Sequence, residues 1–250
     1  LIALGFVKYP VHIKINTGMN RMGIEISEID ELISFLLSQP EIKVEGVFSH
    51  LAASDEKNGK KLTNQQIRTF EKAALSIEQR IGYKVTKHIL NTSGIESYTA
   101  HAMDMVRLGI GLYGVSNQLS LKNVATLSTK ISKTRIVPAN EQIGYGVRNI
   151  TNSKIKLGII PIGYADGFSR NFGNGKAKVF VNGSLVPTVG NICMDMSFID
   201  LTEIEAKAGD SVEIFGANNA IQNIAKSVNT IPYEILSSIS QRVVRIYSED

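Results

Sequence analysis

The stretch VHIKINTG, residues 11–18, is followed by a helical pattern and then by VEGVFSH, residues 44–50. Both runs are short and apolar, as strands are. Between them, apolar residues recur at helical spacing behind the N-cap candidate Ser27, and Pro40 ends the pattern. A strand, a helix and a second strand in this order predict a βαβ unit with parallel strands.

The same order of elements continues along the first half of the chain. Thr63 and Gln66 form a capping-box signature before a second amphipathic helical pattern. Two more short strands are predicted at residues 88–91 and 105–108. Four βα units cannot close an eight-stranded barrel, so residues 1–114 are predicted to form half of one.

Residues 115–250 have a different sequence pattern, in which predicted apolar strands alternate with glycine turns. Asn182-Gly183 signals a hairpin, and residues 221–228 predict one short helix. The fold class is therefore α/β, half of a TIM-type (β/α)8 barrel followed by a mainly β C-terminal domain. The predicted strands of the second domain are at residues 124–137, 154–160, 177–181, 196–200 and 212–215.

Composition excludes several classes of protein. The chain has 250 residues, 43% of them hydrophobic, which is enough for a sizeable core and argues against disorder. One cysteine, Cys193, permits neither an internal disulfide framework nor a Cys-rich zinc site, and it fits a cytoplasmic protein. No apolar run is long enough to span a membrane. The net charge of +4 is not gathered into a basic patch, so nucleic acid is not an expected partner. No metal site is expected either.

Polar residues stand where the four predicted strands end. They are Lys14, His50, Thr92 with Asn91 before it, and Arg107. In a βα barrel the carboxyl ends of the strands carry the active site. Each residue taken alone has an ordinary structural or surface explanation, but their recurrence at equivalent positions favours a shared site.

Eight ordered blocks that cover nearly the whole chain resemble the alanine racemases. No single block is specific, whereas the whole set in this order is. The blocks are HIKINTGMNRMG at 12–23, GVFSH at 46–50, NTSG at 91–94, MVRLGIGLYG at 105–114, GYG at 144–146, IGYADG at 162–167, GNICMD at 190–195 and IPYE at 231–234.

This resemblance implies a pyridoxal 5'-phosphate enzyme whose barrel binds the cofactor. Residues 1–114 would then be the C-terminal half of that barrel. Arg107 would face the pyridine nitrogen and, because a guanidinium does not give up its proton, would leave the ring a weaker electron sink. The remaining residues implied to bind the cofactor are Asn91, Thr92, the backbone at Gly109 and Ile110, and Tyr233.

The resemblance also implies a two-base racemisation. Tyr145 would be one base, and His50, bridging toward Arg107, would help to stabilise its phenolate, since tyrosine is ordinarily a weak base. In this family the tyrosine enters from the partner subunit, so a homodimer with shared active sites is expected. The other base is a lysine on the first barrel strand, and no lysine here stands in that motif. We therefore expect an N-terminal segment to be missing and this chain alone to be inactive.

Substrate contacts follow from the same blocks. Arg21 and the backbone N–H of Met194 would bind the carboxylate of alanine, because a planar guanidinium suits that anion. Lys14, often carbamylated in the family, would orient Arg21, and Tyr164 would line the substrate entrance. The implied function is the interconversion of L- and D-alanine for peptidoglycan synthesis.

Three alternatives stay open at the level of sequence. A related racemase of broader specificity, or one for serine or lysine, would share the fold and cofactor. A noncatalytic pyridoxal-phosphate carrier would lack the β domain and the Gly-Tyr145-Gly block. Finally, the chain would be an inactive fragment of a larger protein, including a fusion with a cell-wall ligase.

Overall fold

The computed structural model describes residues 4–146 and 151–248 of the chain, which form two compact units. Unit 1 comprises Leu1–Leu112 and Ser116–Leu121, and unit 2 comprises Tyr113–Val115 and Lys122–Asp250. The chain passes between the units more than once around residues 113–121. The predicted boundary between residues 114 and 115 lies in this segment and stays a prediction.

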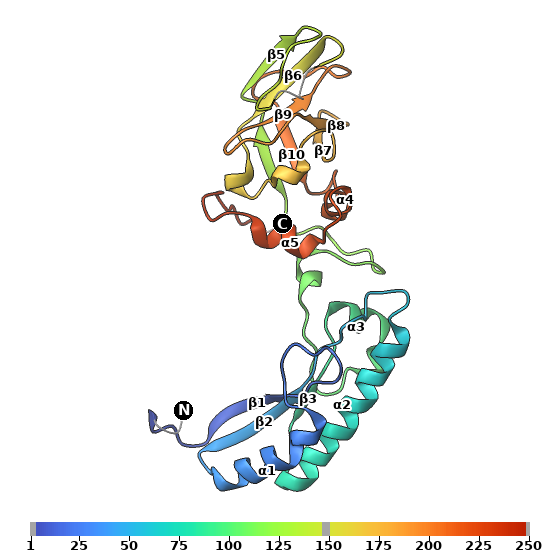
Figure 1. Cartoon of the computed structure of the whole chain (residues 1–250), viewed down its shortest axis with the longest axis vertical. Helices are drawn as coiled ribbons and strands as arrows, with labels where there is room; N and C mark the ends of the chain where they lie inside the picture. The colour runs from blue at the N-terminus through green and yellow to red at the C-terminus, as the bar shows by residue number, and fades with distance from the viewer. Residues whose placement is uncertain (1–3, 147–150, 249–250) are drawn as a thin grey trace. The chain divides into compact units, whose positions relative to one another are not determined.

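Unit 1 is built on a parallel sheet in the order β1-β2-β3 among its described residues (Figure 1). The strands are β1 (Tyr9–Lys14), β2 (Ile42–Phe48) and β3 (Thr86–His88). Helix α1 (Ile29–Ser38) connects the first two strands, and α2 (Lys60–Ile81) connects the next two. This is the repeated βα order predicted from the sequence.

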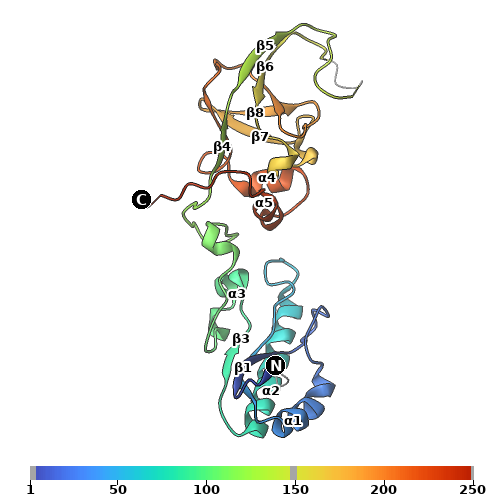
Figure 2. The same ribbon diagram turned by 90° about the vertical axis from the view of Figure 1, so that its left-hand side faces the viewer.

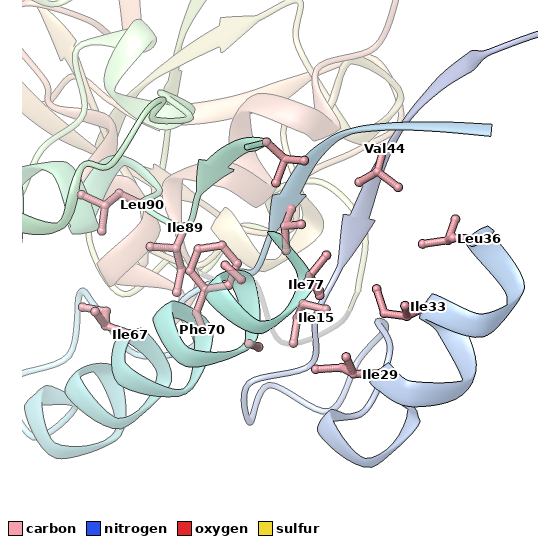
Figure 3. Packing of buried hydrophobic residues seen from close by; sticks show 14 of the residues in the cluster. Ile15, Ile29, Ile33, Leu36, Val44, Ile67, Phe70, Ile77, Ile89 and Leu90 are labelled. Carbon is pink, nitrogen blue, oxygen red and sulfur yellow. The ribbon is translucent and has the colours of Figure 1, made fainter. Parts of the chain in front are cut away.

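The two faces of this sheet differ because side chains alternate along a strand. Ile15, Val44 and Val47 pack against the apolar sides of α1 and α2 around Phe70, which is completely buried (Figure 3). The opposite face carries His12 and Lys14 from β1, Phe48 from β2 and His88 from β3. The helices therefore close one face with a hydrophobic core, and the other face is left to polar and aromatic groups.

Three local predictions for unit 1 are wrong, and the strand predicted at residues 88–91 lies earlier, as β3 at Thr86–His88. Residues 105–108 are not a strand: Asp104 N donates to Lys87 O and Arg107 N to Leu90 O, but a 3₁₀ helix at Ile110–Tyr113 follows before a ladder is formed. Thr63 and Gln66 do not cap a helix, because α2 already begins at Lys60. Gly59 precedes the helix: its N–H is hydrogen-bonded in the preceding turn, and its C=O accepts from Thr63 N in the first turn of α2.

The start of α1 also differs from the prediction. Ser27 lies inside a 3₁₀ helix, Ile26–Glu28, so it cannot be the N-cap of α1. The capping box is instead formed by Glu25 and Glu28 around this short helix, and Glu28 is the N-cap of α1.

Unit 2 is mainly β, with its described strands ordered β4-β10-β7-β8-β9-β6-β5 and antiparallel throughout. Figure 1 labels β9 and β10 of this sheet, and Figure 2 labels β4. The predicted run at 124–137 is two strands. Asn182 and Gly183, both with positive φ, form the tight β7–β8 turn predicted from the sequence. The strands are β4 (Leu127–Lys130), β5 (Lys133–Val137), β6 (Ile155–Ile160), β7 (Lys178–Val181), β8 (Ser184–Val189), β9 (Ser197–Asp200) and β10 (Ser211–Phe215).

Short helices complete the two units. In unit 1, α3 (Thr92–Ser97) follows β3 directly. In unit 2, α4 (Ile221–Ser227) is the helix predicted at residues 221–228, and α5 (Pro232–Ser238) is an additional one. A proline in the first turn of α5 suits a helix start, because the missing N–H has no intrahelical partner there.

Candidate active site

Arg107 is the centre of a cluster at the carboxyl ends of the strands in unit 1. Its Nη1 donates to His88 Nδ1 at 2.5 Å and to His88 O at 3.2 Å. Its Nη2 donates to Ser49 O at 2.6 Å and lies 3.3 Å from both Ile89 O and His50 Nδ1. These acceptors are carbonyl oxygens and imidazole nitrogens. A guanidinium that stays protonated is therefore held by neutral groups in the part of the chain that the structure describes.

Hydrogen bonding fixes the tautomers of two histidines beside Arg107. Because Arg107 can only donate, His88 accepts at Nδ1 and carries its proton on Nε2. That Nε2 lies 2.8 Å from His12 Nδ1, which must then accept. Burial, followed by the charge of Arg107 and by His12, lowers the pKa of His88 to about 4. Both the geometry and the charge therefore favour a neutral His88.

Aromatic packing holds this arrangement from the side. The rings of Phe48 and His88 are stacked with centroids 5.1 Å apart, and Arg107 Cζ lies 5.4 Å from the Phe48 centroid. Gly46, paired with His12 across β1 and β2, provides the room for the imidazole. A Cβ on Gly46 would lie 2.4 Å from ring atoms of His12.

His50 lies among cations. Its Nδ1 faces Arg107 Nη2, and burial, then the charges of Arg107, Arg21 and Lys14, lower its pKa below the ordinary value. A neutral imidazole in contact with Arg107 can accept a hydrogen bond without adding a further positive charge. The structure thus brings together His50 and Arg107, as expected from the sequence.

Thr92 meets the glycine segment after Arg107. Its buried Oγ1 accepts hydrogen bonds from Gly109 N at 3.0 Å and from Gly111 N at 3.3 Å. Asn91, in contrast, has a structural role, because its Oδ1 accepts from Gly94 N as the N-cap of α3, and also from Ser54 Oγ. Thr92 and Gly109 therefore adjoin one another, whereas the Asn91 oxygen is already engaged.

Lys14 and Arg21 belong to the end of β1 and the loop after it. Lys14 Nζ lies 6.0 Å from the centroid of the Phe48 ring. Asn16 organises the loop, since its Oδ1 accepts from Gly18 N and Asn20 N, and its Nδ2 donates to Glu25. The side chain at position 16 is thus a loop-forming amide rather than a charge near Lys14.

Loops of unit 2 carry three other candidate residues. Asn191 Nδ2 donates to Tyr145 O at 2.8 Å, Tyr164 N donates to Cys193 O, and Ala165 N donates to Met194 O. Tyr145, Tyr164 and Met194 are all exposed. The structure gathers the loops that carry these three residues within unit 2.

The loop that carries Tyr164 is fixed by charges. Asp166 accepts from Gly163 N at 2.9 Å and from Arg242 Nε at 2.6 Å, and Arg242 Nη2 also contacts Asp195 at 3.1 Å. Tyr233 is exposed near the start of α5, and Ser238 at the end of that helix donates to Gly167 O. Arg242 thus joins the two loops that carry Tyr164 and Met194.

Several functional neighbours were not found from the sequence. His12 and Lys14 are two residues apart on a strand, and this spacing could have indicated one face shared by both. The contact of His88 with Arg107, and the link from Arg242 to Asp166 and Asp195, join residues distant in the chain and have no local signal.

Comparisons with known proteins agree along the whole chain. A family model described as "Alanine racemase, N-terminal domain" matches residues 5–117, and "Alanine racemase, C-terminal domain" matches residues 124–247. An alanine racemase of Helicobacter pylori strain J99 is 38% identical, with 95% of this chain and 67% of the relative aligned. The chain belongs to the alanine racemase family.

Other family members support this membership. "Alanine racemase 2" of Caldanaerobacter subterraneus subsp. tengcongensis is 41% identical over 96% of this chain and 64% of its own length. The crystal structure of alanine racemase from Streptomyces lavendulae superposes with a TM-score of 0.91 at 31% identity, covering all of this chain and 68% of that one. The predicted fold class, half of a barrel and a β domain, is confirmed. The chain spans about two thirds of the length of these family members.

Neither a metal-binding cluster nor a membrane-spanning helix occurs among the described residues. Within residues 4–146 and 151–248, no three His, Cys, Asp or Glu side chains are grouped so that they could hold a metal ion. No helix in the same ranges is long and apolar enough to cross a membrane.

Proposed function

We propose that the full-length protein is a pyridoxal-phosphate-dependent racemase that interconverts L- and D-alanine. The observation that carries the proposal is the environment of Arg107, a cation whose described partners are three carbonyl oxygens and two imidazoles. A carboxylate facing the cofactor ring would favour a protonated pyridine nitrogen, whereas a guanidinium cannot supply that proton. A weaker electron sink suits racemisation, because it disfavours transamination.

The residues near Thr92 fit the phosphate of this cofactor. Thr92 Oγ1 accepts two backbone N–H groups, so its own proton is left to donate to an anion. Gly109 lies directly beside the hydroxyl, since a Cβ on this residue would be in ordinary van der Waals contact with that oxygen at 3.7 Å. Hydroxyl and exposed backbone N–H groups are suitable phosphate donors. Ile110 and Tyr233 would complete the set.

The remaining roles concern the substrate and the proton. Pyridoxal phosphate, when bound to the substrate amine, delocalises the electron pair left at Cα. Arg21 and Met194 N–H bind the substrate carboxylate, a carbamylated Lys14 orients Arg21, and Tyr164 limits the side chain that enters. Tyr145 from a partner copy removes or returns the Cα proton on one face.

His50 supports this transfer by presenting a neutral imidazole next to Arg107. The second proton acceptor is not assigned to a residue of this chain. A homodimer with shared sites follows from the role given to Tyr145. The product, D-alanine, would be made in the cytoplasm for peptidoglycan synthesis.

Replacing Arg107 by glutamate in the full-length protein tests this proposal. We expect racemisation of alanine to fall about 100-fold, because a preorganised charge is inverted at the site. Formation of pyruvate from alanine should rise, because a protonated ring is the stronger electron sink. Racemisation is measured by circular dichroism and pyruvate by a coupled assay. The control is Arg68→Glu, the same charge change on the exposed side of α2.

The same assays show what would contradict the proposal. If the wild-type protein retains pyridoxal phosphate but racemises serine or lysine faster than alanine, the proposal that alanine is its substrate is contradicted. An Arg107→Glu protein with full racemase activity and no pyruvate formation would remove the role given to Arg107.

A further inference from the structure

Gln66 on α2 is a completely buried amide that contacts three backbone or side-chain groups. Its Oε1 accepts from Ala52 N at 2.9 Å, and its Nε2 donates to His50 O at 3.0 Å and to Thr17 Oγ1 at 3.2 Å. The amide therefore uses both of its N–H groups and its carbonyl. A buried amide costs free energy unless it is hydrogen-bonded in this way, and losing its partners would leave several buried polar groups unpaired.

The hydrogen bonds of Gln66 continue into a chain of hydroxyl groups with one direction. Ser49 Oγ donates to Ile15 O at 2.8 Å, so the proton between Ser49 and Thr17, 2.7 Å apart, comes from Thr17. Thr17 Oγ1 is then free to accept from Gln66 Nε2. The reverse orientation of the amide would place its oxygen against His50 O, so the network also fixes which way Gln66 points.

This network joins the carboxyl ends of two strands. Ile15 and Thr17 follow β1, whereas Ser49 and His50 follow β2. The peptide segment 49–52 is held from two sides, since Ser49 O accepts from Arg107 while His50 O and Ala52 N are bound by Gln66. Gln66 thus fixes the backbone on which the His50 imidazole turns toward Arg107.

We propose that Gln66 is a positioning residue for the racemase reaction, which holds His50 in contact with Arg107 through the backbone of residues 50–52. The inference rests on the function proposed above for His50 and Arg107. Gln66 itself touches neither substrate nor cofactor in this scheme. Its effect is carried by the 3.3 Å contact between His50 Nδ1 and Arg107 Nη2.

Gln66→Leu in the full-length holoenzyme tests the proposal by kinetics. We expect kcat for alanine to fall about 10- to 100-fold, because a misplacement of about 1 Å at a catalytic group has effects of that size. The KM for alanine should change less than twofold, because Gln66 does not contact the residues assigned to substrate binding.

Gln66→Glu keeps the shape of the side chain and adds a pH test. A protonated carboxyl can still donate to His50 O and accept from Ala52 N, whereas a carboxylate would repel that carbonyl. The ratio of variant to wild-type kcat should therefore rise as the pH is lowered. Lys14, Arg21 and Arg107 are the charged groups that face His50, and they are the same in both proteins.

Two variants separate positioning from a loss of stability. Thr63→Val alters the same buried side of α2, where the Thr63 hydroxyl has no hydrogen-bond partner in the described residues, and should leave kcat unchanged. Ile77→Val removes core volume about three turns further along α2 than Gln66, and it should lower the melting temperature without lowering kcat. A Gln66→Leu protein no more impaired in kcat than an Ile77→Val protein of equal stability would overturn the proposal.

A readout that does not depend on activity distinguishes this inference from the proposed function. The His50 imidazole is titrated by NMR in the full-length protein without substrate, with its signal assigned through His50→Gln. In Gln66→Leu, the pKa of His50 should rise toward its ordinary value, because the ring leaves Arg107 and gains water. An unchanged pKa overturns the positioning role whatever the activity. If the pKa of His50 is raised in Gln66→Leu but the wild-type protein does not racemise alanine, the positioning role of Gln66 is supported and the proposed function is contradicted.

Discussion

The two units of this chain hold their candidate residues by different physical means. In unit 1, His50 and the guanidinium of Arg107 are fixed by hydrogen bonds to three buried neutral residues, Gln66, Ser49 and His88. In unit 2, the Tyr164 loop is fixed by Arg242, whose side chain is 51% exposed, through ion pairs with the exposed carboxylate of Asp195 and the buried carboxylate of Asp166. Buried hydrogen bonds are specific and insensitive to salt, whereas exposed ion pairs are weak and screened.

This difference matches the roles proposed for the two regions. Unit 1 would hold a cofactor, which needs one fixed geometry throughout the reaction. Unit 2 would provide loops that admit and release a small substrate, where weaker contacts cost less to rearrange. The comparison therefore predicts large effects from buried groups and reacting atoms, and small, salt-dependent effects from the exposed charges.

The largest effect should come from Tyr145, the residue of unit 2 that is proposed to move a proton. Tyr145→Phe in the full-length protein should lower racemisation about 100- to 10,000-fold, as is usual when a general base is removed. Cofactor absorbance should be retained. Solvent deuterium exchange at Cα, followed by NMR, should be lost more from L-alanine than from D-alanine.

A matched change tests whether the hydroxyl of Tyr145 is responsible. Tyr83→Phe removes an exposed tyrosine hydroxyl just after α2 in unit 1 and should have no effect on racemisation. Near-normal turnover in both directions by Tyr145→Phe would show that the base lies elsewhere.

The sequence predicted the elements of both units better than it predicted their contacts. Hydrophobic periodicity located α1 and α2, because one face of each helix packs on the sheet. The capping-box signature misplaced the start of α2. Gln66 has the residue type of a capping box, but it is buried inside the helix and bonds to Thr17 and His50 instead. Local patterns cannot show such contacts.

The candidate site divides in the same way. His50 and Thr92 could be selected because each follows a predicted strand, and parallel strands bring their ends together. The selection of Arg107 rests on the strand predicted at residues 105–108, which does not form, although Arg107 N still bonds to Leu90 O beyond β3. The contact of Arg107 with His88 could not be selected, and neither could the bond from His88 to His12, since these residues meet only when β1 and β3 take their places beside β2. The roles of Tyr145 and Tyr233 came from the family resemblance alone and stay proposals.

The next effect concerns the acid stability of unit 1 and follows from His88. Its pKa is about 4 in the folded protein, against 6.5 for an ordinary histidine. Between these values the unfolded chain binds more protons than the native protein, so stability falls as the pH is lowered from 6.5 toward 4. The loss should approach about 3 kcal/mol at the acid end of this range. His50, whose pKa is also lowered, should add to it.

Denaturant unfolding at a series of pH values measures this loss. His88→Asn keeps an acceptor for Arg107 but cannot be protonated, so the dependence of unfolding free energy on pH should become shallower. His101→Asn controls for the loss of one imidazole, because the His101 side chain is 38% exposed. An unchanged pH dependence in His88→Asn would mean that the pKa of His88 is the same in the native protein and in the unfolded chain.

The smallest effect should come from the partly exposed ion pairs of Arg242 in unit 2. Arg242→Met keeps the apolar stem but removes the ion pairs with Asp166 and Asp195, so the loops of Tyr164 and Met194 lose their link. We expect the KM for alanine to rise roughly two- to fivefold, the range of a weak surface ion pair, with little change in kcat. Added salt should raise the wild-type KM toward that of Arg242→Met, and should have little effect on the variant.

Arg245→Met is the matched control, because Arg245 donates to the backbone carbonyls of residues 239, 240 and 243, so its loss should leave the salt dependence intact. If Arg242→Met depended on salt as the wild type does, the ion pairs would not set the loop positions, and the contrast between the two units would not hold.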